Sequence, residues 1–421
     1  MSAPDLEFPP LVNRELTPYQ QALVDYADAN PVPFSVDAIK GAAQAATGLD
    51  DFGPGEEGLT ERMQVWVDVG NEPIRTNMAR LGMFALMTKY LSNRMRVFNF
   101  VKQHPEVREI EIKRPLMVGG LPRSGTSHLV NLIAADSRFR AAPIWELDQP
   151  VPDPGQGAGP DGIDPRYKNA QAAWDEMVAG NHYMPAWHPM QPYRIEEDVE
   201  TFAQNFTGHY PDHLYQHAQP WRDYYLAHDQ TEHYEYLKLV MQIMTYFRPK
   251  DQWVTKYPAH IENIPALLNV FPDAVLVETH RDPVASVQSI ATMHTYMAAE
   301  WQTEVKPELQ LDYWTRLCVE LKEAGMRDRH LVEPDQIVEV GFRPFMADNW
   351  SAIHTIYDKL GLEITDQARQ EIDQFIEDHK IGEKVSRINY DVRRHFGVSP
   401  EEIREPFSEY VERFDVPIDV K

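Results

Sequence analysis

The chain has 421 residues, of which 43% are hydrophobic and 11% aromatic, so it can bury a large core and is not expected to be disordered. Its formal net charge of -25 opposes a general nucleic-acid or anionic-membrane surface, although a local basic pocket could still hold a polyanionic small molecule. The single cysteine, Cys318, excludes an intrachain disulfide and a cysteine-based zinc site. We interpret it as a packing residue in a reducing compartment.

The first part of the chain is predicted to be mainly helical. Apolar residues recur there at helical spacing, as at Met83, Met87 and Leu91. The amino terminus lacks the basic and then apolar run of a signal peptide, and no stretch has the apolar length of a membrane span. We therefore expect a soluble cytoplasmic protein. We also expect a helical extension, residues 1–112, packed on a core domain of residues 113–421.

From residue 113 onward, short apolar strands alternate with helices. A strand at 115–119 leads into a glycine-rich loop and a helix over about 125–135, and a helical insertion at about 150–250 follows. The next expected pairs of strand and helix are 253–255 with 261–270, 274–279 with 284–299, and 337–341 with 350–360. This alternation predicts an α/β fold with a P-loop-like, mostly parallel sheet flanked by helices. Ligands of such sheets bind at the carboxyl ends of the strands.

The glycine-rich loop has the frame of a phosphate-binding loop, but Thr126 stands where a nucleotidase carries lysine. Glycines at both ends let successive N–H groups point inward, and the following helix adds its positive amino end. An arginine and three hydroxyls supply further donors. The predicted anion cradle comprises Pro122, Arg123, Ser124, Gly125, Thr126 and Ser127. A tight turn with helix caps is the alternative reading of the same residues.

A second anion site is predicted in the segment HRDPVASVQS. Arg281 ends a strand and Ser289 lies two turns into the next helix, so both can face one anion. Pro283 suits the first helical turn, and Asp282 is placed to cap the helix. Taken alone, the motif would also fit a capped helix beside a surface arginine. Two phosphate sites separated by a nucleoside favour a bisphosphorylated nucleotide over ATP.

The run PLMVGGLPRSGTS resembles the 5′-phosphosulfate loop of the sulfotransferase superfamily, in particular the bacterial branch related to tyrosylprotein sulfotransferases. The likeness covers most of the chain, in family order, through ATGLDDFG, FRAAPIWEL, WVTKYPAHI, FPDAVLVETHRDP and FSEYVERF. It implies a metal-independent enzyme that transfers the sulfuryl group of 3′-phosphoadenosine 5′-phosphosulfate (PAPS) to a hydroxyl or amine acceptor by in-line displacement. The product of PAPS would be adenosine 3′,5′-bisphosphate.

The resemblance implies roles for four residues. Arg281 and Ser289 correspond to the pair that holds the 3′-phosphate, and Lys256 corresponds to the lysine that approaches the leaving phosphate. Sulfuryl transfer needs alignment and charge neutralisation more than covalent help, and Lys256 with Arg123 would supply that neutralisation. An exposed lysine at a strand end is the alternative for Lys256.

The resemblance also implies a base and a further phosphate contact. Glu146 lies at about the position of the glutamate base in the tyrosylprotein branch, and we predict that it takes the acceptor's proton. A histidine of the insertion is the alternative base, and a structural pairing of Glu146 with Arg140 is the other interpretation. A basic segment near the carboxyl end suggests Arg387 as a 3′-phosphate contact. The local sequence SRINYDVRRHFG departs from the family pattern, and a surface cluster explains it equally well.

The insertion carries the clues to the acceptor. His209, His213 and His217 have helical spacing, but Pro211 interrupts such a helix, and we expect no metal site there. The many aromatic residues of the insertion favour a lid or pocket for a small apolar or aromatic acceptor, while carbohydrate, lipid and protein tyrosine remain open. No heptad or other pattern indicates an oligomeric state.

Two other functions remain open at this point. A P-loop kinase or other nucleoside triphosphate enzyme would share the glycine frame, but the loop lysine and a convincing magnesium carboxylate are missing. A catalytically silent relative would bind the nucleotide as a sensor. The joint presence of the predicted catalytic and binding residues speaks against the second alternative.

Overall fold

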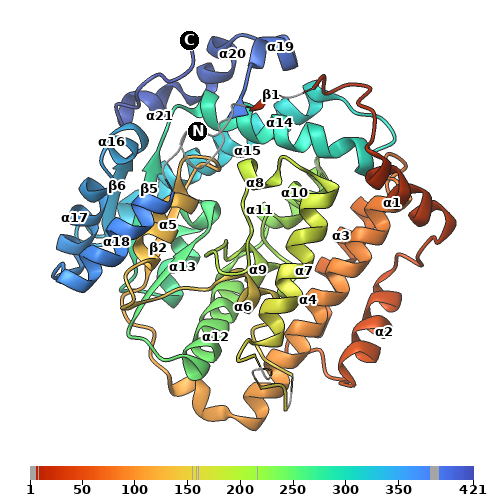
Figure 1. Ribbon diagram of the computed structural model, residues 1–421, viewed down its shortest axis with the longest axis horizontal. Helices are drawn as coiled ribbons and strands as arrows, with labels where there is room; N and C mark the ends of the chain where they lie inside the picture. The colour runs from red at the N-terminus through yellow and green to blue at the C-terminus, as the bar shows by residue number, and fades with distance from the viewer. Residues whose placement is uncertain are drawn as a thin grey trace.

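The computed structural model describes residues 6–421 except for positions 8, 154, 158, 160, 216 and 380–387. A five-stranded sheet of order β3–β4–β2–β5–β6, with all neighbouring strands parallel, lies on the left in Figure 1. The strands are β2 (Leu116–Gly120), β3 (Phe139–Arg140), β4 (Gln252–Lys256), β5 (Val275–His280) and β6 (Ile337–Gly341). The predicted parallel sheet and its four strands are confirmed. The short edge strand β3 was not predicted, because two residues carry no periodic pattern.

Alternate strand residues face two different layers of helices. Leu116 and Val118 of β2 belong to a buried cluster with α5 (Thr126–Ala134), α17 (Asn349–Leu360) and α18 (Asp366–Asp378). Met117 belongs to a larger cluster on the other face. The helices of that face are α12 (Thr231–Phe247), α13 (Ile264–Val270), α14 (Pro283–Trp301) and α15 (Pro307–Asp328). Burial on both faces explains why the strands are continuous apolar runs.

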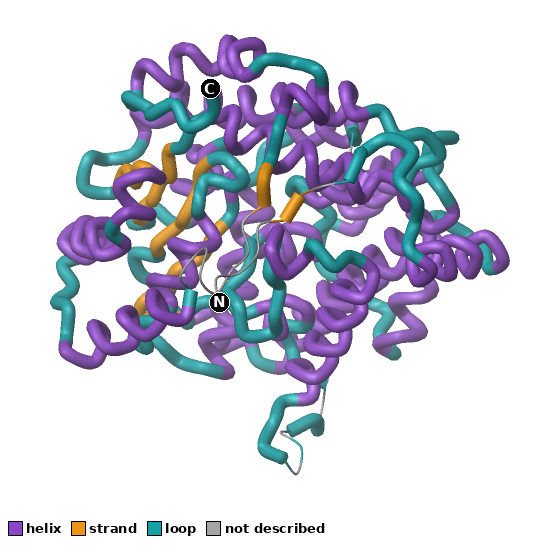
Figure 2. The backbone as a smooth tube through the Cα atoms, turned by 45° about the horizontal axis from the view of Figure 1, so that its top comes forward, coloured by secondary structure: helices purple, strands orange, loops and turns teal. Residues whose placement is uncertain are grey.

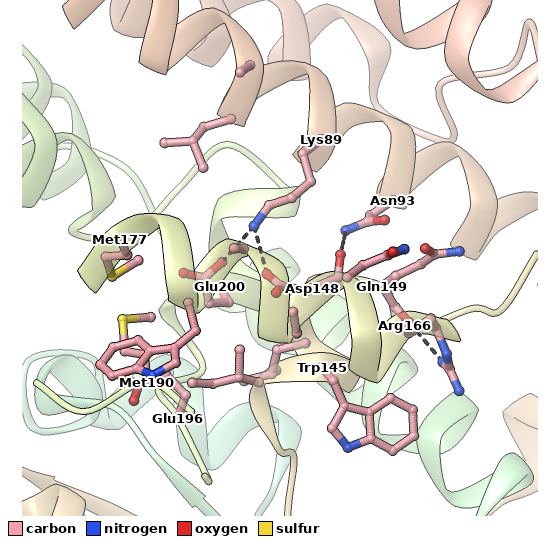
Figure 3. A pocket seen from close by; sticks show the side chains of 18 of the residues that line it. Lys89, Asn93, Trp145, Asp148, Gln149, Arg166, Met177, Met190, Glu196 and Glu200 are labelled. Carbon is pink, nitrogen blue, oxygen red and sulfur yellow. Dashed lines mark hydrogen bonds and ion pairs between the residues drawn. The ribbon is translucent and has the colours of Figure 1, made fainter. Parts of the chain in front are cut away.

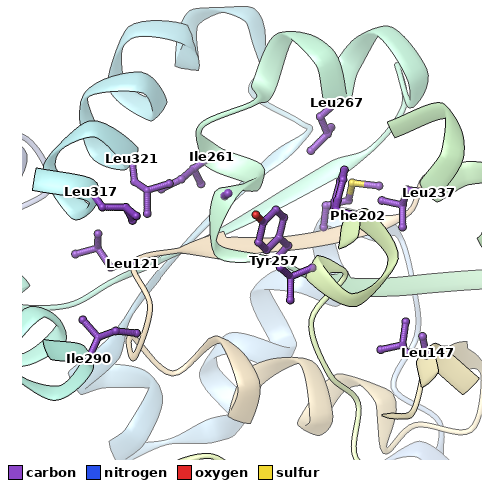
Figure 4. Packing of buried hydrophobic residues seen from close by; sticks show 14 of the residues in the cluster. Leu121, Leu147, Phe202, Leu237, Tyr257, Ile261, Leu267, Ile290, Leu317 and Leu321 are labelled. Carbon is purple, nitrogen blue, oxygen red and sulfur yellow. The ribbon is translucent and has the colours of Figure 1, made fainter. Parts of the chain in front are cut away.

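The larger cluster fills the space between the sheet and α15. Figure 4 shows Leu317 and Leu321 beside Ile261, which belongs to the short 3-10 helix η2 (Pro258–Ile261) after β4. Cys318 is fully buried in the same cluster, and burial raises the pKa of its thiol to about 12. The neutral thiol therefore packs as a small apolar group, as predicted.

The amino-terminal part of the chain consists of helices on the side of the molecule away from the sheet (Figure 1). They are α1 (Pro18–Ala29), α2 (Val36–Thr47), α3 (Glu56–Gly70), α4 (Asn77–Gln103) and the 3-10 helix η1 (Pro105–Glu109). Ser35 and Thr76 begin α2 and α4 with side-chain caps on backbone N–H groups. Trp66 of α3 packs edge-on against Phe206 and Trp221, with ring centroids 5.3 and 5.6 Å apart. A second buried cluster thus joins these helices to the insertion.

The region between β3 and β4 is helical, as predicted for the insertion. Its helices are α6 (Ile144–Asp148), α7 (Pro165–Gly180), α8 (Met184–Trp187), α9 (Val199–Gln204), α10 (Tyr210–Tyr215), α11 (Gln219–Leu226) and α12. Pro211 lies in the first turn of α10, where its missing N–H costs nothing. His209 precedes α10 and contacts Glu262 at 3.0 Å, whereas His213 contacts His294 at 3.2 Å. The predicted interruption by Pro211 is confirmed, because α10 begins at Tyr210 and leaves His209 outside the helix that carries His213.

The carboxyl-terminal part of the chain packs against both faces of the sheet. It contains the 3-10 helices η3 (Arg329–Leu331) and η4 (Glu405–Phe407), α16 (Phe342–Ala347), α19 (Val392–Phe396), α20 (Pro400–Arg404) and α21 (Ser408–Arg413). A separate parallel strand pair, β1 (Leu6–Glu7) with β7 (Ile388–Asn389), lies apart from the main sheet in Figure 2. Across the described residues, no helix combines the length and the apolar content that crossing a membrane would require.

Buried histidines make the stability of this fold depend on pH. Burial lowers the pKa of His213 to about 4 and that of His280 to about 3. An unfolded histidine binds a proton near pH 6.5, so below that value the unfolded chain holds more protons than the folded one. The free energy of unfolding, measured by denaturant titration, should therefore fall from about pH 6.5 to about pH 5, by up to about 1.4 kcal/mol per pH unit for each such histidine.

A variant of His213 separates the effect of this buried histidine on stability from the titration of other groups. His213→Gln should make the dependence on pH shallower, whereas His354→Gln, at an exposed position of α17, should leave it unchanged. Equal slopes in the wild type and His213→Gln would show that burial of this histidine does not set the acid sensitivity.

Candidate active site

The glycine loop begins where β2 and β5 approach each other most closely. The φ angles of Gly120 and Gly125 are 137° and 93°, in the range that favours glycine. A Cβ on Gly120 would lie 2.3 Å from Oγ1 and 2.8 Å from the backbone oxygen of Thr279. Gly125 immediately precedes α5, so the positive amino end of this helix borders the loop. Thr279 of β5 therefore leaves no room for a side chain at Gly120, and Gly125 lies where α5 begins.

The hydroxyls of the loop do not all face outward. Ser124 Oγ donates to the Leu121 carbonyl at 2.5 Å and lies 2.5 Å from Thr279 Oγ1. It thus holds the loop against β5. Ser127 Oγ accepts a hydrogen bond from Lys256 Nζ at 3.1 Å. Ser124 thus closes the loop onto the Leu121 carbonyl with both its hydroxyl and its backbone N–H, which lies 3.3 Å from that oxygen, whereas Ser127 links the loop to the end of β4.

The structure joins the loop to the second predicted anion site. Arg123 Nε donates to Ser289 Oγ at 3.2 Å, and Arg281 Nη1 donates to the Arg123 carbonyl at 2.6 Å. Arg123 has a φ of 66°, which is uncommon for a residue other than glycine, and these two bonds hold it there. Arg123, Ser289 and Arg281 therefore form one connected group at the carboxyl edge of the sheet.

Arg281 retains unused hydrogen-bonding capacity. Its buried Nε has no hydrogen-bond partner among the residues that the structure describes. The guanidinium carbon lies 4.0 Å from the centroid of the Phe342 ring, which fixes the plane of the group. An unsatisfied guanidinium N–H beside a glycine cradle fits an anionic ligand.

Lys256, the last residue of β4, is fully buried next to β2. Its Nζ lies 2.7 Å from Glu197 Oε1 and 3.4 Å from Glu196 Oε1. Burial alone would lower the pKa of Lys256, but the two carboxylates outweigh burial and raise it. The side chain is therefore a held cation, and the alternative of an exposed lysine does not apply.

His188 completes the group around Lys256. Its Nε2 lies 3.4 Å from Glu196 Oε1. Burial, followed by the positive charge of Lys256, lowers the pKa of His188 to about 3, so the imidazole is neutral at neutral pH. Potential ligand atoms of His188, Glu196 and Glu197 lie within 4.8 Å of one another, a spacing that a metal ion would accept. The ammonium of Lys256 faces both carboxylates and balances one of their two negative charges.

A second trio with metal-like spacing, Glu278, His280 and Glu339, lies at β5 and β6. Glu278 contacts Lys322 Nζ at 2.8 Å and Arg329 Nη1 at 3.1 Å. The positive charges of Lys322 and Arg329 thus lie against the acidic side of this trio.

Glu146 lies on α6 with both carboxylate oxygens engaged. Its Oε2 is 2.7 Å from Arg140 Nη2, and its Oε1 is 2.6 Å from Arg248 Nε. The pairing with Arg140 that the sequence left open is therefore present. Within the described chain, no hydrogen bond or ion pair joins Glu146 to Lys256. Its role as a base stays a prediction.

Sequence reasoning missed Glu196, Glu197 and His188. They lie in the insertion, and the adjacent carboxylates in the run RIEED were the only cue. Arg387, predicted to contact the 3′-phosphate, lies outside the described residues.

A cavity of about 590 Å³ lies between α4, α6 and α7. Glu196 is part of its wall, so the cavity reaches the group around Lys256. Apolar side chains make up much of the lining, including Leu86, Ile144, Leu147, Trp174, Met177 and Met190. The cavity is thus a largely apolar space in which Glu196, the neighbour of Lys256, forms part of one wall.

A polar cluster lies elsewhere on the wall of the same cavity (Figure 3). Lys89 Nζ lies 2.8 Å from Asp148 Oδ1 and 3.6 Å from Glu200 Oε2. Tyr90 donates to Glu200 Oε2 at 3.0 Å, and Asn93 donates to the Asp148 carbonyl at 2.7 Å. These groups give the cavity hydrogen-bonding capacity away from Lys256.

Comparison with known proteins places this site in context. A family model described as "Sulfotransferase family" matches residues 115–366. The chain is 27% identical over 144 residues to the omega-hydroxy-beta-dihydromenaquinone-9 sulfotransferase Stf3 of Mycobacterium bovis and of Mycobacterium tuberculosis. This stretch is 34% of the chain and 36% of each relative, so the match spans about a third of these curated relatives.

Two solved structures share the fold over most of its length. The crystal structure of the sulfotransferase STF9 from Mycobacterium avium has a TM-score of 0.81 and 23% identity, over 92% of this chain and 98% of that one. The sulfotransferase STF1 from Mycobacterium tuberculosis H37Rv has a TM-score of 0.77 and 24% identity, over 89% and 98%.

The close approach of Gly120 to Thr279 makes an added side chain at this position unfavourable. Gly120→Ala should destabilise the protein by about 1–3 kcal/mol or more, because its Cβ would press on the backbone of β5 and its φ is unfavourable for alanine. Gly41→Ala, in the middle of α2 with open space around it, should be neutral or stabilising by about 0.5–1 kcal/mol. Denaturant titration of both variants would check this, and equal stability of the two would contradict the proposed constraint.

Proposed function

The chain belongs to the Sulfotransferase family, and from this premise we propose that it transfers the sulfuryl group of PAPS to a hydroxyl or amine of a small molecule. One observation carries the proposal. The glycine loop, the Arg123–Ser289–Arg281 group and the buried Lys256 meet at the same edge of the sheet. Two anion sites and a held cation at one edge suit a donor that carries a phosphosulfate and a separate phosphate.

The described residues fit the two anionic ends of PAPS. Backbone N–H groups of the loop and the amino end of α5 would hold the phosphosulfate. Arg281, with its unsatisfied Nε, and Ser289 would hold the 3′-phosphate. We propose Arg387 as a further contact of that phosphate. PAPS, when bound, supplies the activated sulfuryl group and its leaving phosphate.

Lys256 and Arg123 would neutralise the charge that develops during transfer. Lys256 is fixed by Ser127 and Glu197, and Arg123 is fixed by Ser289. Preorganised cations in a site with little water stabilise developing charge without rearranging. We therefore propose a reaction that uses these side chains in place of a metal ion.

The acceptor's proton needs a base beside the cavity. We propose Glu196, because it lines the cavity and also lies 3.4 Å from Lys256 Nζ. Glu146, the base suggested by the resemblance, has both oxygens on guanidinium groups and is not among the described residues that line the cavity.

The cavity supports an acceptor with an apolar body. Its lining is largely aliphatic, aromatic and thioether, and burial of such surface is worth about 25 cal/mol per Å². The relative Stf3 is named for a hydroxylated menaquinone, which also has an apolar body. We propose a hydroxylated apolar compound that places its reacting oxygen near Glu196.

Transfer from radiolabelled PAPS to a panel of hydroxylated apolar compounds tests the function. We expect labelled product with the wild type and a kcat at least about 100-fold lower with Lys256→Met, because a fixed cation is lost from the transition state. Affinity for adenosine 3′,5′-bisphosphate, measured by calorimetry, should change far less. Lys113→Met removes an exposed lysine and serves as the control. Tighter binding of ATP with magnesium than of the bisphosphate would contradict the proposal and favour a kinase.

The identity of the base is tested by two isosteric variants. Glu196→Gln should lower kcat by about 10²–10⁴-fold and remove the acidic limb of the pH profile. Glu146→Gln should mainly lower stability, because Arg140 and Arg248 lose a charged partner. Glu235→Gln changes an exposed carboxylate of α12, outside the cavity lining, and should leave kcat unaltered. Loss of turnover in Glu146→Gln at unchanged stability would assign the base to Glu146 instead.

A further inference from the structure

Residues 418–420 are fastened beside the proposed 3′-phosphate site. The backbone N–H groups of Asp419 and Val420 donate to Asp282 Oδ2 at 2.8 and 3.0 Å. Arg404 donates to the same oxygen at 3.1 Å and to the Val420 carbonyl at 2.6 Å. Asp282 also caps α14, the helix that carries Ser289. The backbone of this segment is thus held at the amino end of α14.

The side chain of Asp419 lies between two guanidinium groups. Its Oδ2 is 3.6 Å from Arg281 Nε, the nitrogen that has no hydrogen-bond partner among the described residues. Its Oδ1 accepts a hydrogen bond from Arg343 Nε, in the first turn of α16. Arg343 follows the carboxyl end of β6 by two residues, so it belongs to the same edge of the sheet as the glycine loop.

The contact between Asp419 and Arg281 is weaker than the site allows. Charge-assisted N–H···O bonds are about 2.7–2.9 Å long, and 3.6 Å lies well outside that range. Arg281 is therefore attracted by a carboxylate that does not satisfy its Nε. A phosphate carries more charge and more acceptor oxygens than a carboxylate, so it would compete well for this nitrogen.

We infer that Asp419 is an internal anion that the 3′-phosphate of the donor displaces from Arg281, and that Arg343 then becomes a further contact of this phosphate. The inference rests on the proposed function, which assigns Arg281 to the 3′-phosphate. The exchange costs affinity only for a nucleotide with a 3′-phosphate, which must displace the carboxylate from Arg281, whereas a nucleotide without one leaves Asp419 in place. The side chain of Arg343 is half exposed, so it has room to follow the incoming anion.

Calorimetry with adenosine 3′,5′-bisphosphate and adenosine 5′-phosphate tests the exchange. Asp419→Asn keeps the backbone donors to Asp282 and the side-chain size but removes the competing charge. It should raise the affinity for the bisphosphate about 3–10-fold and leave that for the monophosphate unchanged. Glu409→Gln removes a charge from exposed α21 and should alter neither affinity. Adding Arg343→Gln to Asp419→Asn should lower the affinity for the bisphosphate alone.

Hydrogen exchange gives a second readout that needs no variant. The amides of Asp419 and Val420 should exchange faster when adenosine 3′,5′-bisphosphate is bound, because displacement of the carboxylate loosens the segment. Unchanged or weaker bisphosphate binding by Asp419→Asn, or greater protection of these amides, would overturn the inference and leave the proposed function intact. Failure of the wild type to bind the bisphosphate would overturn both.

Discussion

The site depends on the close approach of β2 and β5 at Gly120. No Cβ fits between Gly120 and Thr279. The chain also leaves β2 with a positive φ at Gly120, a conformation that glycine adopts readily. Thr279 then lies within hydrogen-bonding distance of Ser124, which holds the loop against β5. Because β5 ends one residue before Arg281, the same approach brings Arg281 to the Arg123 carbonyl. One steric constraint therefore shapes the glycine loop and joins it to the Arg123–Ser289–Arg281 group.

In this strongly acidic protein, the cations at the edge of the sheet are fixed and locally balanced by acceptors of the chain itself. Each of the three central cations has an internal acceptor: Arg123 has Ser289, Lys256 has Glu197, and Arg281 has the Arg123 carbonyl. Buried charges without partners are costly, and these acceptors offset that cost while the donor is absent. The same acceptors hold the cations in place, so little rearrangement is needed when charge develops during transfer. In the proposed exchange, the carboxylate of Asp419 is a further internal partner of Arg281, and the 3′-phosphate replaces it.

The anion sites at the edge of the sheet and the apolar cavity are built from different parts of the chain. The family match covers residues 115–366 and includes the sheet, the glycine loop, Lys256 and the Arg281–Ser289 pair. The cavity takes one wall from α4, which precedes the matched region, and another from α7 of the insertion. The glycine loop, Lys256 and the Arg281–Ser289 pair thus belong to the sheet within the matched region, while α4 adds a part of the cavity wall from outside it.

The sequence by itself determined the strands, the helices behind them, the glycine frame and the eight-residue spacing of Arg281 and Ser289. These features follow from local periodicity and from backbone rules that act over a few residues. Only the tertiary structure decided which charges meet: Glu146 with Arg248, Lys256 with Glu196 and Glu197, and Asp419 with Arg281 and Arg343. Such pairs are far apart along the chain, and no local pattern records them. The geometry that the sheet and its surrounding helices impose in space therefore decided that Glu196 lies beside Lys256 and lines the cavity, whereas Glu146 lies between two arginines.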